Sequence, residues 1–349
     1  MIEKKYIFLF PLFIISIGLA VPAIFSIQPT GKYSVGFDII HQKNKQGMPI
    51  LISTWYPASE GSEKMTWSDY IRLGSAEENK EPNKLLEEFK QTIAIKWILG
   101  LSIPEQTFDS SIHKHTYSNR GIAMAPGKFP LIIALSSPQS YIESFEFLAS
   151  HGFVVVAVDG AFPNDTMMDQ NPLFFVKYTD LLEELLDLMT SKNYINPNDI
   201  SVFGHGFGIQ PAMYLAMRNP KIKRVINFDG GFFGPRSRST ISIDYRPQNL
   251  HIPLLHIITR EQESEDDKTL IKTLSNPITR VTIKPDFFKH HDLSSFGRFA
   301  THTAMVRGDK SDSINNIFSD IHQITLSFLL NKPIILKDTS TLFLENINH

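Results

Sequence analysis

Two uninterrupted apolar runs lie near the middle of the sequence, at residues 131–135 (Leu-Ile-Ile-Ala-Leu) and 153–158 (Phe-Val-Val-Val-Ala-Val). Runs of this kind are typical of strands buried on both faces, as in a parallel sheet covered by helices. Helical spacing of apolar residues follows at 173–189 and 313–330. Other strand-like segments occur at residues 50–56, 200–203, 225–228, 254–258 and 280–283. This alternation predicts an α/β fold with a mainly parallel central sheet and helices on both faces.

The composition excludes several classes of protein. The 349 residues carry 34 basic and 36 acidic side chains, for a net charge of −2. No charge excess favours nucleic acid or an anionic membrane surface as a partner. The absence of cysteine excludes a disulfide framework, zinc-thiolate sites and a cysteine nucleophile. We expect no metal and no organic cofactor.

The first 27 residues differ from the rest of the chain. Lys4 and Lys5 precede a stretch without a charged residue that extends to Gly31. A basic start followed by an apolar run predicts a signal peptide or an N-terminal membrane anchor over residues 1–27. A buried core helix is the alternative, which Pro11 and Pro22 would interrupt. The preferred interpretations place residues 28–349 outside the cytoplasm, in the periplasm or the extracellular space or anchored to the outer face of the membrane.

Residues 59–111 break the alternation of strands and helices. A Glu/Lys-rich segment is followed by an apolar stretch with helical spacing over residues 85–101. We interpret residues 59–111 as a helical cap inserted into a single domain. An apolar helix at the mouth of a site would contact lipid or substrate; the alternative is a helix packed on its own core.

A glycine-rich turn follows the strand-like segment 200–203. Residues 201–208 read Ser-Val-Phe-Gly-His-Gly-Phe-Gly. The nucleophile elbow of α/β hydrolases is G-x-S-x-G between a strand and a helix. Gly204 and Gly208 match its flanking glycines, but the central position is Gly206, which has no hydroxyl to attack an ester.

The wider sequence resembles the platelet-activating-factor acetylhydrolase-like group of α/β hydrolases. Segments that carry the resemblance lie at residues 29–36, 55–58, 127–131 and 149–155 and at the elbow, and the similarity extends to Phe296. The resemblance implies an α/β-hydrolase fold and hydrolysis of carboxylic or lipid esters.

The resemblance also implies an acid and a base. Asp229 matches the group's acid, just after the strand that follows the elbow. His290 matches its histidine, with His291 as the close alternative. In such a triad histidine takes the proton of the nucleophile, and the acid holds the histidine tautomer. Glu261, with Glu263, is the alternative acid, because many α/β hydrolases place their acid after the strand that ends here near residue 258.

The oxyanion region departs from the group's pattern. Where the group shows S-H-G-x-G, residues 136–140 read Ser-Ser-Pro-Gln-Ser. Backbone N–H groups make an oxyanion hole, and Pro138 has none. We place this region at Ser137, Gln139 and Phe207. A serine here has the wrong geometry to replace the nucleophile.

These features predict an ester-hydrolase scaffold without its serine, inactive or nearly so, which retains a pocket for a small-molecule or lipid ester. The alternative is an active hydrolase in which His290 and Asp229 activate water. Membrane contact is expected only through the N-terminal segment and the cap. His113 and His115 have the spacing of a metal pair, but no third ligand is suggested nearby, so packed or surface histidines are favoured.

Overall fold

A computed structural model describes residues 28–45, 47, 49–61, 63–76, 113–136, 138–158, 174–232, 245–295, 310–336 and 339–347. The strands are β1 (Ser34–Lys43), β2 (Pro49–Ala58), β3 (Lys64–Thr66), β4 (His115–Arg120), β5 (Phe129–Leu135), β6 (Val154–Val158), β7 (Ile195–His205), β8 (Ile222–Phe228), β9 (Leu254–Thr259), β10 (Ile278–Ile283) and β11 (Leu342–Ile347). The helices are α1 (Trp67–Ala76), α4 (Ile142–Ser150), α6 (Phe174–Thr190), α7 (Ile209–Arg218), α8 (Glu265–Ile271) and α11 (Ser311–Leu329). Short 3₁₀ turns lie at Pro138–Tyr141, Gly206–Gly208, Pro247–Asn249 and His290–Leu293.

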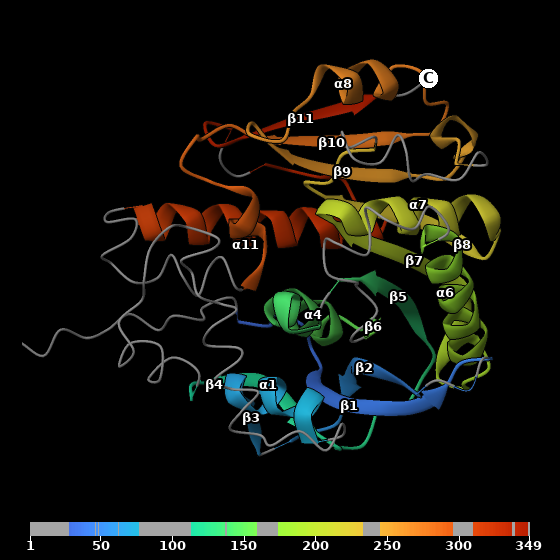
Figure 1. The fold of residues 1–349 in the computed structure, drawn as a ribbon. Helices are drawn as coiled ribbons and strands as arrows, with labels where there is room; N and C mark the ends of the chain where they lie inside the picture. The colour runs from blue at the N-terminus through green and yellow to red at the C-terminus, as the bar shows by residue number, and fades with distance from the viewer. Residues whose placement is uncertain are drawn as a thin grey trace, which may run out of the picture.

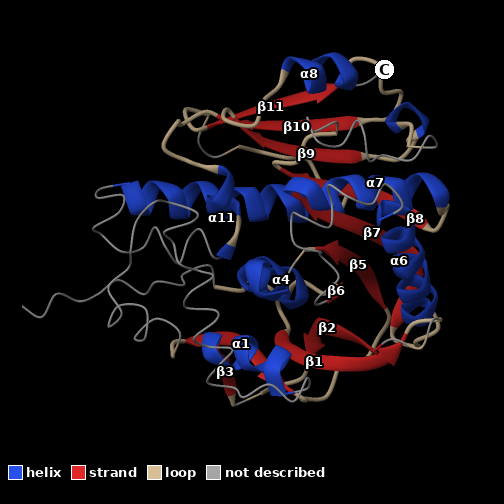
Figure 2. Ribbon diagram, in the orientation of Figure 1, coloured by secondary structure: helices blue, strands red, loops and turns tan. Residues whose placement is uncertain are grey.

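The described strands form one 11-stranded sheet in the order β11-β10-β9-β8-β7-β5-β6-β2-β1-β4-β3. The strands from β10 to β6 pair in parallel, whereas β11 and β2 flank this block antiparallel. Figures 1 and 2 show the sheet with its helices around it. All seven strands predicted from apolar runs are present, as β2 and β5 to β10. The predicted mainly parallel α/β architecture is therefore confirmed.

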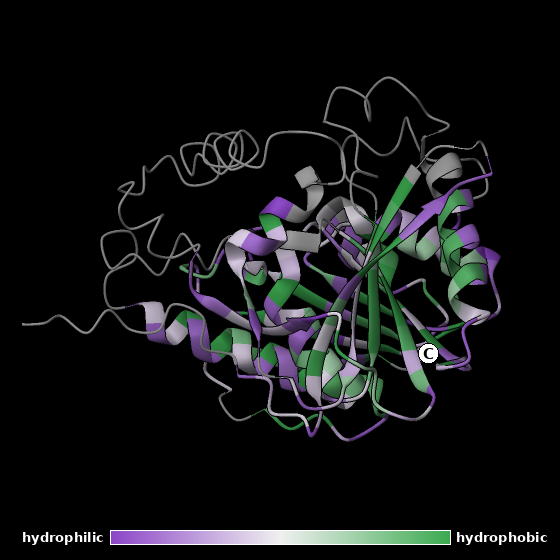
Figure 3. Cartoon of the chain, turned by 90° about the horizontal axis from the view of Figure 1, so that it is seen from below, coloured by the Kyte–Doolittle hydropathy of each residue, from purple (hydrophilic) through white to green (hydrophobic). Residues whose placement is uncertain are grey.

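Two hydrophobic clusters cover the two faces of the sheet. One contains side chains of α4 and α11, and the other contains side chains of α6, α7 and α8. Every residue of β6 is buried, as expected for a strand between two helical layers. Figure 3 shows the central strands as the most hydrophobic part of the molecule. The sheet is therefore a rigid support whose two faces are both occupied by packing.

Strands that the apolar pattern did not indicate lie toward the sheet edges. β1 is buried only over residues 35–37, and in β11 only Leu342 is buried. β3 and α1 belong to the segment interpreted as a cap, and β3 pairs with β4 at the sheet edge. Residues 77–111 of that segment and the N-terminal residues 1–27 lie outside the described residues. In the part of the chain that the structure describes, no helix is both long enough and apolar enough to cross a bilayer.

A buried carboxyl joins α4 to β4. Glu146 is 1% exposed, and its Oε1 accepts hydrogen bonds from the backbone N–H groups of Tyr117 (3.0 Å) and Ser118 (2.8 Å). The hydroxyl of Tyr70 lies 3.4 Å from the same oxygen. Burial, the largest effect, raises the pKa of Glu146 to about 7, and hydrogen bonds from Ser118, Thr116 and Tyr117 oppose the increase. Glu146 therefore gains its charge near neutral pH.

This carboxyl makes stability depend on pH. Between the ordinary pKa of 4.5 and the folded pKa of about 7, the folded protein keeps a proton that the unfolded chain has lost. The free energy of unfolding should therefore fall as pH rises through this window, by about 3 kcal/mol. Glu146→Gln stays neutral and can still accept the two backbone hydrogen bonds, so its profile should be flatter and its stability at pH 8 higher. Urea unfolding from pH 4.5 to 8 measures this, with the exposed Glu60→Gln as control. A fall as steep in Glu146→Gln as in the unmodified protein would assign the pH dependence to other groups.

Candidate functional site

The predicted site residues meet at the carboxyl edge of the parallel strands. Gly206 follows β7, Asp229 follows β8, and His290 begins the 3₁₀ turn after β10. Parallel strands place their carboxyl ends at one edge, and open α/β sheets bind ligands there. The topology therefore brings together three positions that are separated by up to 84 residues in the sequence.

The turn between β7 and α7 has the backbone geometry of a nucleophile elbow, with glycine at its central position. Gly206 has a φ of +53°, the left-handed conformation that glycine adopts at little cost. A Cβ atom placed on Gly206 would lie 3.3 Å from both Cε1 and Nε2 of His290. A Cβ on Gly204 would lie 2.6 Å from the backbone N of Ile209, and one on Gly208 would lie 2.2 Å from the carbonyl oxygen of Leu135. The flanking glycines are thus required for packing, whereas the central position accepts a side chain that would face His290.

Asp229 and His290 form a hydrogen-bonded pair. His290 Nδ1 lies 2.9 Å from Asp229 Oδ2. The Asp229 side chain is completely buried, whereas 22% of the His290 side chain is exposed. Because Nδ1 faces a carboxylate, it carries the proton of the neutral ring and leaves Nε2 bare toward residue 206. A bare Nε2 at this place is the arrangement of a general base.

Thr259, at the end of β9, satisfies the rest of the Asp229 carboxylate. Its backbone N–H donates to Oδ1 at 2.6 Å, and its hydroxyl lies 2.9 and 2.8 Å from Oδ1 and Oδ2. Asp229 itself has a φ of +51°, and its N–H donates to the carbonyl of Ile257 at 2.7 Å. A buried carboxylate with these donors remains an acceptor that can orient a histidine.

Asn227 holds the turn that carries Asp229. Its side-chain oxygen accepts from the N–H of Gly230 at 2.9 Å, and its amide nitrogen lies 2.7 Å from the carbonyl of Gly230. The same nitrogen lies 2.8 Å from Nδ1 of His256. Burial, aided by the charge of Arg280, lowers the pKa of His256 to about 3, so this ring stays neutral and accepts the hydrogen bond. The acid is therefore positioned by a second layer of buried polar groups.

The turn that carries His290 is also closed by a carboxylate. Asp292 is fully buried, and its Oδ2 accepts from the N–H of Lys289 at 2.7 Å. The Asp292 N–H donates in turn to the Lys289 carbonyl at 2.8 Å. His291, the alternative base, has its ring centre 5.4 Å from that of His290. The histidine that is hydrogen-bonded to Asp229 is His290.

Two aromatic rings surround the elbow. His205, the residue before Gly206, stacks on His290 with ring centres 4.1 Å apart, and Tyr141 contacts its ring at 5.4 Å. Burial lowers the pKa of His205 well below its ordinary value, and the nearby charge of His290 lowers it further. Burial also raises the pKa of the Tyr141 phenol well above its usual range, and the charge of Asp229 adds to this effect. Both groups are therefore neutral at pH 7.

The oxyanion region is described in part. Ser137 lies outside the described residues, and only the backbone of Gln139 and Phe207 is described. Gln139 lies in the turn Pro138–Tyr141, which leads into α4. Phe207 directly follows Gly206 in its 3₁₀ turn, where hydrolases of this kind place an oxyanion N–H. Ser136, at the end of β5, is 6% exposed, too buried to present its hydroxyl to a substrate.

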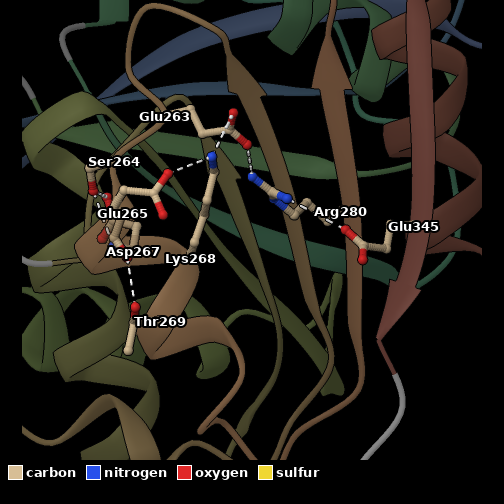
Figure 4. Close-up of polar contacts among 8 residues, drawn as sticks. All are labelled: Glu263, Ser264, Glu265, Asp267, Lys268, Thr269, Arg280 and Glu345. Atoms are coloured by element: carbon tan, nitrogen blue, oxygen red, sulfur yellow. Dashed lines mark hydrogen bonds and ion pairs between the residues drawn. The ribbon is translucent and has the colours of Figure 1, made fainter.

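The alternative acids take part in ion pairs away from His290 instead. Glu261 lies 3.5 Å from Lys289 Nζ. Glu263 pairs with Arg280 and lies 3.4 Å from Lys268, and Figure 4 shows this network beside the start of α8. Ser264 caps that helix by accepting from the N–H of Asp267 at 3.1 Å. The structure thus brings Asp229, and neither glutamate, to His290.

Sequence reasoning missed His205, Asn227 and Thr259. Parallel pairing places the ends of β7, β8 and β9 side by side, so Thr259 was open to inference from its position alone. The stacking of His205 had no signal, since it depends on the path of the His290 turn. Among the described residues, no group of three or more His, Asp or Glu side chains could hold a metal ion. His115 instead lies on β4 with Nδ1 3.2 Å from the carbonyl of Lys64.

Comparison with known proteins gives distant relatives and a shared fold. No protein-family model matches the sequence. The chain is 28% identical over 129 residues to the S-formylglutathione hydrolase of Mus musculus, which is 36% of this chain and 42% of that protein. It is 27% identical over 135 residues to the same enzyme of Bos taurus, covering 38% and 44%. The matches thus span less than half the length of these relatives.

A solved structure extends the likeness to the whole domain. The ferulic acid esterase from Streptomyces cinnamoneus superposes with a TM-score of 0.64 at 15% sequence identity, over 91% of this chain and 98% of that one. The chain therefore has the α/β-hydrolase fold.

Proposed function

We propose that this chain is a carboxylic-ester-binding α/β hydrolase that retains its acid and base but cannot form an acyl-enzyme on a serine at the elbow. One observation carries the proposal. Gly206 occupies the left-handed elbow position, and a Cβ atom added to Gly206 would lie 3.3 Å from His290 Nε2. Without an oxygen there, no acyl-enzyme forms on the elbow. Removing the serine of such a triad typically lowers the rate by several powers of ten.

The class of ligand follows from two sources. Relatives named as a hydrolase and an esterase support an ester carbonyl as the group that is bound. The resemblance to the platelet-activating-factor acetylhydrolase-like group supports a lipid ester in particular. An N-terminal segment in which Lys4 and Lys5 precede an uncharged, apolar run supports export or anchoring of the domain, where it would meet lipids.

Binding without turnover tests this proposal. A short-chain phosphatidylcholine below its micellar concentration, and separately p-nitrophenyl butyrate, should raise the melting temperature of the unmodified protein while neither is consumed. Gly206→Leu fills the space beside His290 and should weaken this effect. If neither ester shifts the melting temperature, the retained-pocket proposal is wrong.

A second function is favoured by one specific observation, the intact Asp229–His290 pair. In this route His290 Nε2 takes a proton from water, and the resulting hydroxide attacks the ester carbonyl. Asp229 stabilises the imidazolium, which then returns its proton to the leaving alkoxide, so the products are a free acid and an alcohol. No covalent intermediate forms on the protein.

His290→Ala separates the two functions. If water attack operates, the unmodified protein turns over p-nitrophenyl butyrate slowly, and His290→Ala lowers that rate about 100-fold or more. If the chain only binds, purified preparations of both proteins give the rate of the buffer. The matched control is His291→Ala, which should leave any turnover in place. Hydrolysis of equal rate in the unmodified protein and His290→Ala would exclude the water route.

A further inference from the structure

We propose that His205 is a positioning residue, which fixes the ring of His290 by stacking and takes over a restraint that a serine at position 206 would supply. In a complete triad the histidine ring is held at both nitrogens, by the acid at Nδ1 and by the serine at Nε2. In the part of the chain that the structure describes, the His290 ring has a hydrogen bond at Nδ1, to Asp229, and Gly206 offers none at Nε2. A ring held at one nitrogen can rotate about that hydrogen bond unless packing prevents it.

The stack supplies this packing. The His205 and His290 ring centres are 4.1 Å apart, and their planes are inclined by only 21°. A parallel stack at this separation leaves little room for the His290 ring to tilt out of the Asp229 direction. Rotation of the ring would lift Nε2 away from the position faced by Gly206. The stack therefore acts on the orientation of Nε2.

His205 is itself firmly held. It is the last residue of β7, and its other neighbour is the edge of the Tyr141 ring, with centres 5.4 Å apart and planes inclined by 64°. Tyr141 is 3% exposed and in turn contacts Phe203 and Phe145 of the core. His205 is thus clamped between a core aromatic ring and the base.

The turn of the base is joined to the same region. Ser295, just beyond the His290 turn, accepts a hydrogen bond from the N–H of Glu143 at 3.3 Å, near the start of α4. Tyr141 immediately precedes α4. This hydrogen bond therefore ties the segment just after the His290 turn to the start of α4, next to Tyr141.

The charge state of His205 suits this role. The Nε2 atom of His205 is buried without a hydrogen-bond partner among the described residues, which is costly for a charged ring. A neutral imidazole can stack on His290 in either protonation state of the base, whereas a second cation would repel the charged form. A phenylalanine could make the same stack, but an alanine could not.

The decisive measurement reads the order of the His290 ring directly. In the unmodified protein labelled with ¹⁵N-histidine, we expect a strongly downfield, exchange-protected Nδ1 proton of His290, assigned by its loss in His290→Ala. His205→Ala should broaden or abolish this resonance, while His205→Phe should retain it. Persistence of the resonance in His205→Ala would overturn the proposal, as would its loss in His205→Phe, and so would its absence in the unmodified protein.

A kinetic readout separates positioning from a purely structural role. In a Gly206→Ser background the serine restores the restraint at Nε2, so His205→Ala and His205→Phe should both keep kcat and KM for p-nitrophenyl butyrate within a few-fold of the Gly206→Ser protein. A loss of kcat of about 100-fold or more in His205→Ala in this background would show that His205 is needed for the fold of the site itself and would contradict the proposal. The proposal for His205 rests on the proposed function only in taking His290 as the base. The NMR resonance is measured without a ligand. If the protein binds no ester, the proposed function fails, but the resonance still decides the role of His205.

Discussion

Replacing Gly206 by serine should create an esterase. The Cβ atom of the new side chain would lie 3.3 Å from Cε1 and Nε2 of His290, so the ring need give way by only a few tenths of an ångström. The hydroxyl, one bond further out, can then hydrogen-bond to Nε2, whose ring is already paired with Asp229 at 2.9 Å. Because loss of a triad serine costs several powers of ten, we expect hydrolysis of p-nitrophenyl butyrate to rise at least about 1,000-fold.

Matched variants define what this gain means. Gly206→Ala introduces the same Cβ without the oxygen and should give no gain, and Gly206→Ser combined with His290→Ala should lose it. A folded Gly206→Ser protein without activity would contradict the alignment of acid, base and backbone donors. The defect would then lie at residues 136–140, where Pro138 removes an N–H from the oxyanion region.

Adding a methyl group at Gly204, the flanking glycine that precedes the turn, should unfold the elbow. In Gly204→Ala the Cβ would lie 2.6 Å from both the N and the Cα of Ile209, and backbone atoms at the start of α7 cannot move aside by changing a rotamer. We expect a loss of about 3 kcal/mol or more in the free energy of unfolding. Gly206→Ala is the matched control, because its Cβ meets only the His290 ring among the described residues, and its left-handed backbone costs about 1–2 kcal/mol.

Urea unfolding of the two variants measures the difference. A Gly204→Ala protein as stable as Gly206→Ala would show that strand β7 and helix α7 approach less closely than the structure indicates. The pair also separates the two uses of glycine at the elbow, since Gly204 serves packing, whereas Gly206 occupies the position that we propose for a lost reacting group.

The central sheet was predictable because its strands are buried on both faces. Such strands, β5 and β6 above all, lack polar residues and stand out in the sequence as apolar runs. Strands β1 and β11 were not recognised, because each has exposed positions that mix polar and apolar residues. β11 pairs with β10, which is distant in the chain, so local pattern does not encode its pairing, whereas β1 pairs with the next strand, β2, and with the more distant β4.

Those residues of the candidate site whose place follows from their position in the fold were predictable. The elbow glycines and the resemblance led to Gly206, Asp229 and His290, and the structure brings these three together. That they act in catalysis or binding stays a prediction. Thr259 could have been inferred from its place at the end of β9, beside the end of β8. Asn227 escaped because its hydrogen bonds depend on side-chain directions across neighbouring strands, and His205 because its stack depends on the path of the His290 turn.

Intact-protein mass spectrometry after incubation with a fluorophosphonate tests the central claim most directly. The account predicts no adduct on the unmodified protein, because Gly206 offers no oxygen beside His290, and a single adduct at position 206 in Gly206→Ser. An adduct on the unmodified protein that disappears in His290→Ala would contradict the account, since it would show that another side chain serves as the nucleophile.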